Sequence, residues 1–201
     1  MIMAVDFKKI IKNLIASHCD RINTTMPGTI VSYNPATRRA VVQLSLSKTS
    51  PEGIVLKAPR VVSVPVVFPT GGGVAITWPL HPGDGVMLHF CQRSLENWLD
   101  HGDDVVDDFR QSNISDAIAV PGLNHGAATE PAHAENMVIA FGSASMEMTP
   151  SGGMVLNLPG GLTIKGKVTG DQDAVFNNIS ASTHTHAGVQ PGSGRSGTPA
   201  A

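Results

Sequence analysis

The fold is decided by the stretch from Thr29 to Leu46, which reads TIVSYNPATRRAVVQLSL. Apolar and polar residues alternate in Thr29–Tyr33 and again in Arg39–Leu46, and both runs are rich in β-branched residues. Between them lies Asn34-Pro35-Ala36-Thr37, a sequence typical of a turn. The stretch therefore predicts two antiparallel strands joined as a hairpin.

Further short runs of the same kind follow this hairpin, and proline or glycine separates them. They are Val61–Val64, Val66–Phe68, Val74–Trp78 and Val86–Phe90. No run between them has the length and period of a helix, so the pattern favours a small antiparallel barrel rather than alternating strands and helices. We predict an all-β fold with this barrel over residues 24–122, closing near Pro121-Gly122.

Composition excludes several classes of protein. The 201 residues carry 14 Lys and Arg against 16 Asp and Glu, a formal net charge of -2, which gives no electrostatic case for binding nucleic acid or an anionic membrane. With 41% hydrophobic and 15% charged residues, the chain is too apolar to be disordered. Aromatic residues make up only 4%, which disfavours a large aromatic-lined pocket for a small molecule.

The chain shows no signal for export or membrane anchoring. Residues 61–80 are uncharged over the length of a membrane span, but three prolines and Gly71-Gly72-Gly73 interrupt them, which a lipid-exposed helix does not tolerate. Cys19 and Cys91 form no disulfide framework and are each expected to be a reduced, packed thiol. We therefore expect a chain made in the cytoplasm without a membrane anchor.

Residues 1–23 are predicted to form a helical segment, with the helix itself over residues 6–18. Its apolar residues recur at spacings of three and four, while Lys8, Lys9 and Lys12 lie opposite. Two interpretations stay open: the helix packs on its own domain, or it docks on a partner or a neighbouring subunit.

The composition changes after the barrel. Residues 123–136 have no apolar period and are predicted to be a linker. Residues 137–182 hold short alternating strands, among them Met146–Met148, Met154–Leu158 and Leu162–Lys165, each with two or three inward residues. Such a strip cannot bury its apolar side alone, so it predicts a homo-oligomer in which copies intertwine as a thin β-prism filled by aliphatic and methionine side chains.

The last segment, residues 183–201, contains Thr183-His184-Thr185-His186 before a tail rich in Gly, Pro and Ser. In an extended chain His184 and His186 point to the same side. A solvated pair is the plain interpretation. The alternative is a metal site completed by symmetry, because three chains would supply six imidazoles. Six-coordination disfavours zinc, and geometry does not choose between iron and nickel. A metalloenzyme with open coordination positions is a further hypothesis.

Other constellations of reactive residues do not form a recognisable site. His81, His89 and Cys91 match no metal-ligand spacing, and the acidic run from Asp100 to Asp108 lacks the pattern of a calcium loop. Gly71-Gly72-Gly73 is not followed by Lys and Ser or Thr, so it is no phosphate loop. No catalytic residues are predicted, and the protein is not expected to be an enzyme.

Several short motifs occur in order along the barrel. They are Pro27-Gly28, Ser32-Tyr33-Asn34-Pro35, Val64-Pro65-Val66, Phe68-Pro69, Gly71-Gly72-Gly73, His81-Pro82-Gly83-Asp84, Arg93-Ser94 with Trp98, Ser115-Asp116-Ala117 and Pro121-Gly122. Together they resemble the N-terminal OB-fold domain of the membrane-piercing spikes of contractile-tailed bacteriophages, the baseplate assembly protein V type. The ending with His184 and His186 resembles the needle apex of the same spikes.

The resemblance implies a homotrimer located at the baseplate tip of the virion and attached to a baseplate hub protein. Residues 137–182 would wind into a trimeric β-helix, and residues 183–201 would form an apex holding one iron ion through His184 and His186 of each chain. The tip would pierce the host outer membrane mechanically, without nucleic acid or a small-molecule substrate. The alternative is an OB-fold module that binds an oligosaccharide or a nucleic acid, which would need exposed aromatic and basic residues on the barrel.

Overall fold

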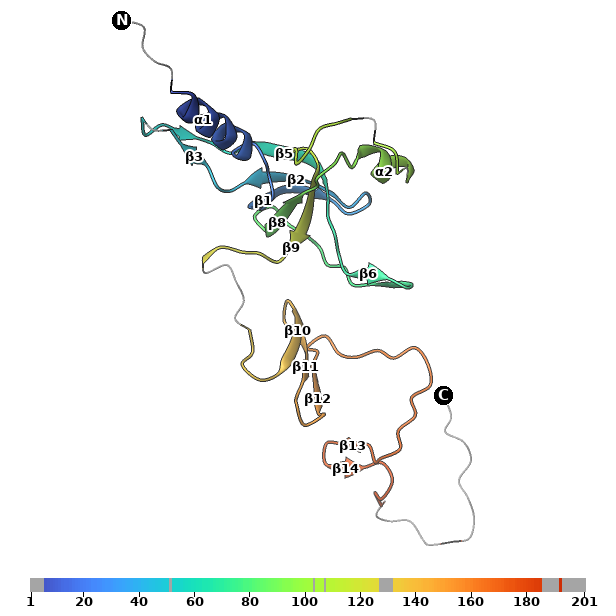
Figure 1. Cartoon of the computed structure of the whole chain (residues 1–201). Helices are drawn as coiled ribbons and strands as arrows, with labels where there is room; N and C mark the ends of the chain where they lie inside the picture. The colour runs from blue at the N-terminus through green and yellow to red at the C-terminus, as the bar shows by residue number, and fades with distance from the viewer. Residues whose placement is uncertain are drawn as a thin grey trace, which may run out of the picture. The chain divides into compact units, whose positions relative to one another are not determined.

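The computed structural model describes residues 6–50, 52–102, 104–106, 108–126, 132–185 and 192 (Figure 1). The chain divides into two compact units, Met1–Pro131 and Ala132–Ala201. Each unit has its own sheets, and each is described by itself below.

A helix opens the first unit. Helix α1 spans Phe7–Cys19, in agreement with the predicted helix, and the Asp6 carboxylate caps it by accepting a hydrogen bond from the Lys9 amide at 3.2 Å. None of the 13 residues of α1 is buried. The helix forms as the sequence predicts, yet its apolar side has no core to cover within the described chain.

Five strands of the first unit form one antiparallel sheet. They are β1 (Thr25–Asn34), β2 (Arg39–Leu44), β5 (Arg60–Pro65), β8 (Gly85–Phe90) and β9 (Ala117–Pro121), in the spatial order β5-β2-β1-β8-β9. The predicted hairpin is confirmed as β1–β2, with Asn34 paired to Arg39 and the Asn34 side chain accepting from the Ala36 amide at 3.0 Å. The sheet is therefore built outward from this hairpin.

The two ends of the sheet approach each other. Val66, just after β5, forms a parallel bridge with Ala119 of β9, and the Val67 amide donates to the Ala119 carbonyl at 2.9 Å. The five strands thus make a half-barrel around one apolar core, which agrees with the predicted barrel. Its buried members are Ile30, Ala40, Val42, Leu44, Val61, Val64, Val66, Phe68, Leu80, Val86, Leu88, Phe90, Ala117 and Ala119.

Three details of the barrel prediction are wrong. Val74–Trp78 does not enter the five-stranded sheet, because β7 (Val74–Ala75) pairs locally with β6 (Thr70–Gly71) around two left-handed glycines. Val66–Phe68 is no separate strand but continues from β5 into the bridge with β9. The fifth strand is instead β9, and the short helix α2 (Glu96–His101) precedes it.

A second small hairpin lies beside the N-terminal helix. Strands β3 (Lys48–Thr49) and β4 (Val55–Leu56) pair with each other, and the Lys48 ammonium contacts both carboxylate oxygens of Asp20 at 2.8 Å. This ion pair joins the end of α1 to the hairpin. Both side chains are exposed, so the contact positions the helix more than it stabilises the fold.

The second unit contains two small antiparallel sheets. Strands β10 (Met137–Phe141), β11 (Ala144–Met148) and β12 (Met154–Asn157) form a three-stranded meander, and β13 (Val175–Phe176) pairs with β14 (Ile179–Ser180). The predicted strand at Leu162–Lys165 is wrong, since these residues have no regular secondary structure and no partner strand among the described residues. The predicted β-helix is built from three intertwined chains. The structure describes one chain, so the β-helix stays a prediction.

Strand register divides the side chains of the meander between two different faces. Directly paired residues share a face, and Glu147, paired with Val138 and Val155, lies on a mixed face with Ser145 and Asn157. Phe141 puts an aromatic ring on the opposite face, where only aliphatic and methionine residues were expected. The members of that apolar face are Met137, Ile139, Phe141, Ala144, Met146, Met148, Met154 and Leu156.

The apolar face has no cover within the described chain. No residue of β10, β11 or β12 is buried, in contrast to the core strands of the half-barrel. The two cysteines are free thiols, as expected, but the expectation that both are packed is wrong for Cys19, which is exposed on α1. No helix among the described residues is both long and apolar enough to cross a membrane.

Candidate metal-binding apex

The predicted metal ligands follow a tight hairpin. Asn177 and Asn178 connect β13 to β14, and both have left-handed backbone angles, with φ of 47° and 63°. Two successive left-handed residues make the type I′ turn that suits a two-residue hairpin, and asparagine tolerates this conformation. The hairpin returns the chain to Ser180, four residues before His184.

A network of short hydrogen bonds orders the turn after β14. The Ser182 amide donates to the Asp173 carboxylate at 3.0 Å, and the Thr183 amide and hydroxyl donate to the Ser180 hydroxyl oxygen at 2.9 and 2.7 Å. Hydrogen bonds from the side chains of Ser180 and then Ser182 lower the pKa of Asp173. The carboxylate is therefore charged at neutral pH and holds the turn that presents His184.

The His184 ring is oriented by the backbone. Its Nδ1 lies 2.9 Å from the Ser180 carbonyl oxygen, and the His184 amide donates to the same oxygen at 3.2 Å. A carbonyl oxygen only accepts, so Nδ1 carries the proton, and in the neutral ring the lone pair is on Nε2. Histidines that bind metals are commonly oriented in this way, with one nitrogen donating to a carbonyl and the other coordinating.

Only one of the two predicted ligands can be placed. His184 lies at the surface of the apex, whereas His186 is outside the described residues. Within the described part of the chain, no group of three or more His, Cys, Asp and Glu side chains is arranged to hold a metal ion.

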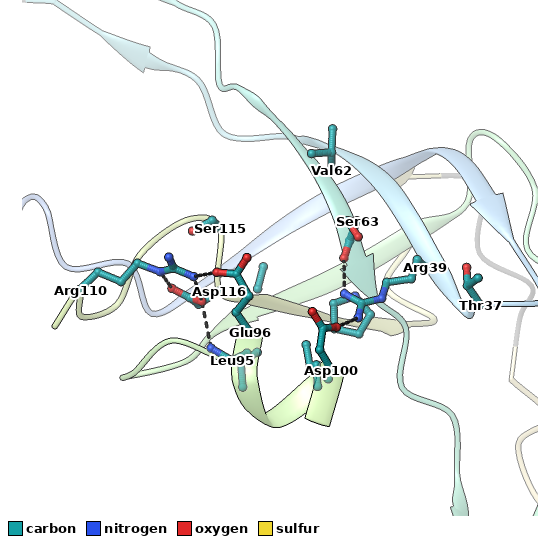
Figure 2. Close-up of a pocket in the computed structure, with 13 residues that line it drawn as sticks. Thr37, Arg39, Val62, Ser63, Leu95, Glu96, Asp100, Arg110, Ser115 and Asp116 are labelled. Atoms are coloured by element: carbon teal, nitrogen blue, oxygen red, sulfur yellow. Dashed lines mark hydrogen bonds and ion pairs between the residues drawn. The ribbon is translucent and has the colours of Figure 1, made fainter. Parts of the chain in front are cut away.

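The first unit contains a polar groove beside α2, shown in Figure 2, with a volume of about 600 Å³. Its arginines already have partners within the chain. Arg39 donates to the Ser63 carbonyl at 3.0 Å and lies 3.5 Å from the Asp100 carboxylate. The Ser63 backbone is left-handed, with φ of 57°, where the register of β2 with β5 shifts. We therefore interpret the groove as the place where α2 packs against the edge of the sheet, rather than as a ligand site.

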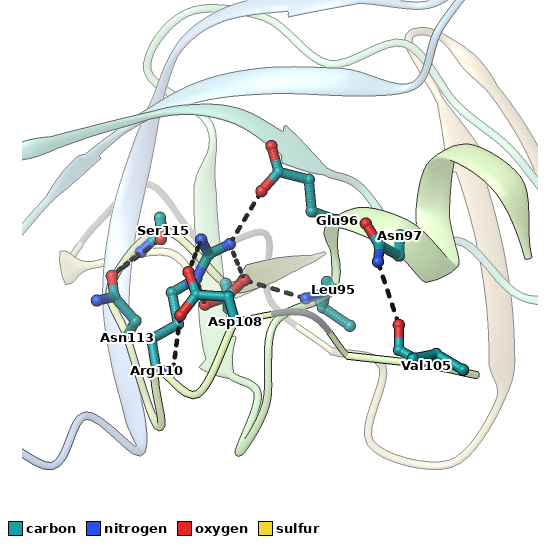
Figure 3. Close-up of polar contacts among 9 residues, drawn as sticks. Leu95, Glu96, Asn97, Val105, Asp108, Arg110, Asn113 and Ser115 are labelled. Carbon is teal, nitrogen blue, oxygen red and sulfur yellow. Dashed lines mark hydrogen bonds and ion pairs between the residues drawn. The ribbon is translucent and has the colours of Figure 1, made fainter. Parts of the chain in front are cut away.

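Arg110, which also lines this groove, lies at the centre of a cluster of ion pairs (Figure 3). Arg110 donates to both oxygens of Asp116, at 2.7 and 2.9 Å, and to Asp108 at 2.7 Å. Asp116 is 2% exposed and also accepts from the Leu95 amide at 3.1 Å. Burial acts to raise the pKa of Asp116, but the bonds from Arg110 and Leu95 outweigh it, and the pKa lies below its ordinary value.

The arrangement around Asp116 is structural. Every acceptor oxygen of the buried carboxylate has a donor, and the same bonds raise the pKa of Arg110, first through its hydrogen bonds with Asp116. Burial first, and the Asp116 charge second, also raise the pKa of the Cys91 thiol, which is therefore a poor nucleophile. The motif Ser115-Asp116-Ala117 was noted in the sequence, but its partner Arg110 was not, because nothing local indicates which arginine a buried aspartate will meet.

Two families of known proteins match the chain. Residues 26–122 match the family described as phage protein Gp138 N-terminal domain, and residues 178–200 match the GpV apex motif. The first covers the half-barrel, and the second covers the turn that presents His184. The chain thus belongs to the phage baseplate spike proteins of the GpV and gp138 type. A search of curated proteins found no match.

Membership of this family fixes the broad role of the protein. It is a structural component of the phage tail baseplate and hence of the virion, with other baseplate proteins as partners. The family is generally non-enzymatic, in agreement with the expectation from the sequence.

Proposed function

We propose that three copies of this chain form the central spike tip of the baseplate, which pierces the host outer membrane mechanically when the sheath contracts. The observation that carries the proposal is the uncovered apolar face of the β10–β12 meander. Eight apolar side chains and no polar one share that face. An exposed apolar surface of this kind marks an interaction site.

Three chains can bury this apolar face more completely than one chain can. Each meander is one layer, and a layer with one apolar side must pack against another. Three such layers around a threefold axis bury all three apolar faces against each other and leave Glu147, Ser145 and Asn157 of each mixed face in water. A narrow prism of this kind is stiff, as a puncturing needle requires.

The apex would hold one iron ion through His184 and His186 of each chain. The donor set fits, because neutral imidazole nitrogens suit iron and the Ser180 carbonyl orients the His184 ring with its lone pair on Nε2. Two ligands per chain make no closed site alone, whereas threefold symmetry makes six. The ion would serve as a cross-link that binds only the assembled tip, stabilising it by about 2.7 kcal/mol when free metal is 100-fold above its dissociation constant.

The half-barrels would form the collar that attaches the spike to a baseplate hub protein. Oligosaccharide or nucleic-acid binding by this domain is the alternative. Phe68 and Phe90 are buried in the core and cannot stack on a base or sugar, although Trp98 and Phe109 are exposed. The net charge of -2 also gives no attraction for a polyanion.

The proposal is tested by measuring mass and metal on the same purified protein. Light scattering should return three chains, and elemental analysis should return one iron per three chains. The double variant His184→Ala/His186→Ala should lose the metal while its half-barrel stays folded, and His81→Ala, an exposed histidine of the first unit, should keep it. A monomeric wild-type protein would contradict the trimer, and a metal-free trimer would contradict the apex.

A further inference from the structure

Helix α1 presents an apolar face that nothing in the described chain covers. Phe7, Ile10, Ile11 and Leu14 follow one another at spacings of three, four and seven residues from the first, so they lie on one side of the helix. Their exposed fractions run from 40% for Ile11 to 73% for Phe7. No described strand or helix packs against α1, which Figure 1 shows at the periphery of the first unit.

The lysines of α1 have no counter-ion within the described chain. Lys8 and Lys12 lie one turn apart, and each comes three residues before an isoleucine, so together they form one edge of the apolar face. Lys9 lies on the opposite side of the helix. None of the three forms an ion pair with a described residue, and α1 itself contains no acidic residue. A matching occupant must therefore bring both an apolar surface and carboxylates.

This combination of features distinguishes between the possible occupants. A bundle of α1 helices from several copies would cover the apolar face, but it would leave the ammonium groups without counter-ions, because the helix brings no carboxylate of its own. A membrane surface could also receive a basic amphipathic helix. The chain, however, is a baseplate component whose partners are other baseplate proteins. A protein groove with carboxylates along one edge satisfies the apolar side chains and the lysines together.

We propose that α1 is the element by which each chain binds a second baseplate protein. The helix lies in an apolar groove of that protein, with its four apolar side chains as anchors. Lys8 and Lys12 face carboxylates along one edge of the groove. This inference rests on the proposed attachment of the collar to a hub protein, and it assigns the attachment to one helix and one kind of surface.

Photo-crosslinking in assembled phage tails identifies what covers α1. The full-length variant Leu14→p-benzoylphenylalanine carries the photoreactive group on the apolar face. Ala16→p-benzoylphenylalanine, nearly opposite on the same helix, is the matched control. We expect the group at position 14 to cross-link to a different baseplate protein in several-fold higher yield than the group at position 16. A cross-link to a second copy of this chain, or no cross-link above the control, would overturn the inference.

Matched charge variants test the edge of the groove. Lys12→Glu and Lys9→Glu make the same change in charge on the same exposed helix, but Lys12 borders the apolar face and Lys9 does not. Purified tails assembled with Lys12→Glu should retain several-fold fewer copies of the chain by quantitative mass spectrometry, whereas Lys9→Glu should retain the wild-type number. Circular dichroism should show both variants folded. Equal retention of the two variants would overturn the assigned edge.

Two further measurements separate this inference from a membrane contact and from the proposed function. The wild type should not co-sediment with vesicles of phosphatidylcholine and phosphatidylglycerol; co-sedimentation that Leu14→Ser abolishes would overturn the inference. The mass of the purified chain tests the trimer independently. A trimer without a cross-link from position 14 to another protein overturns only this inference. A monomer overturns the trimer, and the cross-link then still decides whether α1 is the attachment helix.

Discussion

The two units of this protein use the same kind of strand in opposite ways. In the half-barrel, β8 alone contributes Val86, Leu88 and Phe90 to a core that excludes water. In the second unit, β10 and β12 have comparable apolar side chains, and all of them stay exposed. The comparison teaches that alternation decides which face of a strand is apolar, whereas the number of strands available decides whether that face is buried by the same chain.

The largest effect on assembly is expected from a charge on the uncovered apolar face of the second unit. Leu156→Asp would put a charge into the interface of each chain, at a cost of about 3 kcal/mol or more per chain, since a buried charge without a partner costs at least that much. Light scattering should show monomers at concentrations where the wild type forms the proposed trimer. Circular dichroism should show a folded half-barrel in the same sample.

Val155→Asp is the matched control for this change. Val155 is adjacent in sequence and lies on the mixed face beside Glu147. The variant should remain trimeric. If both variants stay trimeric, the apolar face is not the interface, and the contrast between the two units loses its explanation.

The next effect concerns the half-barrel. Arg110→Ala leaves the buried Asp116 carboxylate without its main partner, which should lower the free energy of unfolding of this domain by about 3–5 kcal/mol at neutral pH. The second unit should keep its ability to assemble. Urea unfolding followed at several pH values gives the measurement, and Arg93→Ala, an exposed arginine nearby, should change little.

The pH dependence of this variant has a definite sign. Since the pKa of Asp116 in the folded protein lies below its ordinary value of 3.8, its charge stabilises the wild type above that pH, and the stabilisation is lost as the pH falls through the folded-state pKa. The difference between wild type and Arg110→Ala should therefore shrink below about pH 4. A difference that grows on acidification would mean that the ion pair is not the cause.

The smallest effect should come from α1, which belongs to the first unit but resembles the second in having no core. Asp6→Ala removes the cap of the helix at a cost of about 1 kcal/mol. Circular dichroism should show less helix at unchanged urea midpoint of the half-barrel, while Asp6→Asn should retain the helix. A lowered midpoint would show that α1 is coupled to the core after all.

The sequence predicted those elements whose pattern is strong over a sufficient length. The β1–β2 hairpin has period two on both sides of a recognisable turn, and α1 has more than three turns of helical period. Strand β9 was missed because its buried positions are Ala117 and Ala119, whose small side chains give little contrast in hydrophobicity. Helix α2 has six residues, too few to display a period.

The candidate apex likewise has some features that the sequence predicts and others that it does not. The spacing of His184 and His186 is visible in the sequence, and so is the need for more ligands than one chain supplies. The contact of the His184 ring with the Ser180 carbonyl is not visible in the sequence, because it depends on how the turn after β14 folds. Likewise, the pairing of Arg110 with Asp116, six residues apart between α2 and β9, depends on how that segment folds back on itself, which no sequence pattern shows.

The register of β11 with β12 limits how this meander can change by insertion or deletion. Met148 pairs with Met154, and the Thr149 amide donates to the Gly153 carbonyl across the turn at 2.9 Å. Adding one residue to a strand would rotate every later side chain to the other side and turn Leu156 outward. Insertions and deletions within these strands should therefore be tolerated in pairs of residues, because only an even number keeps Leu156 on the apolar face.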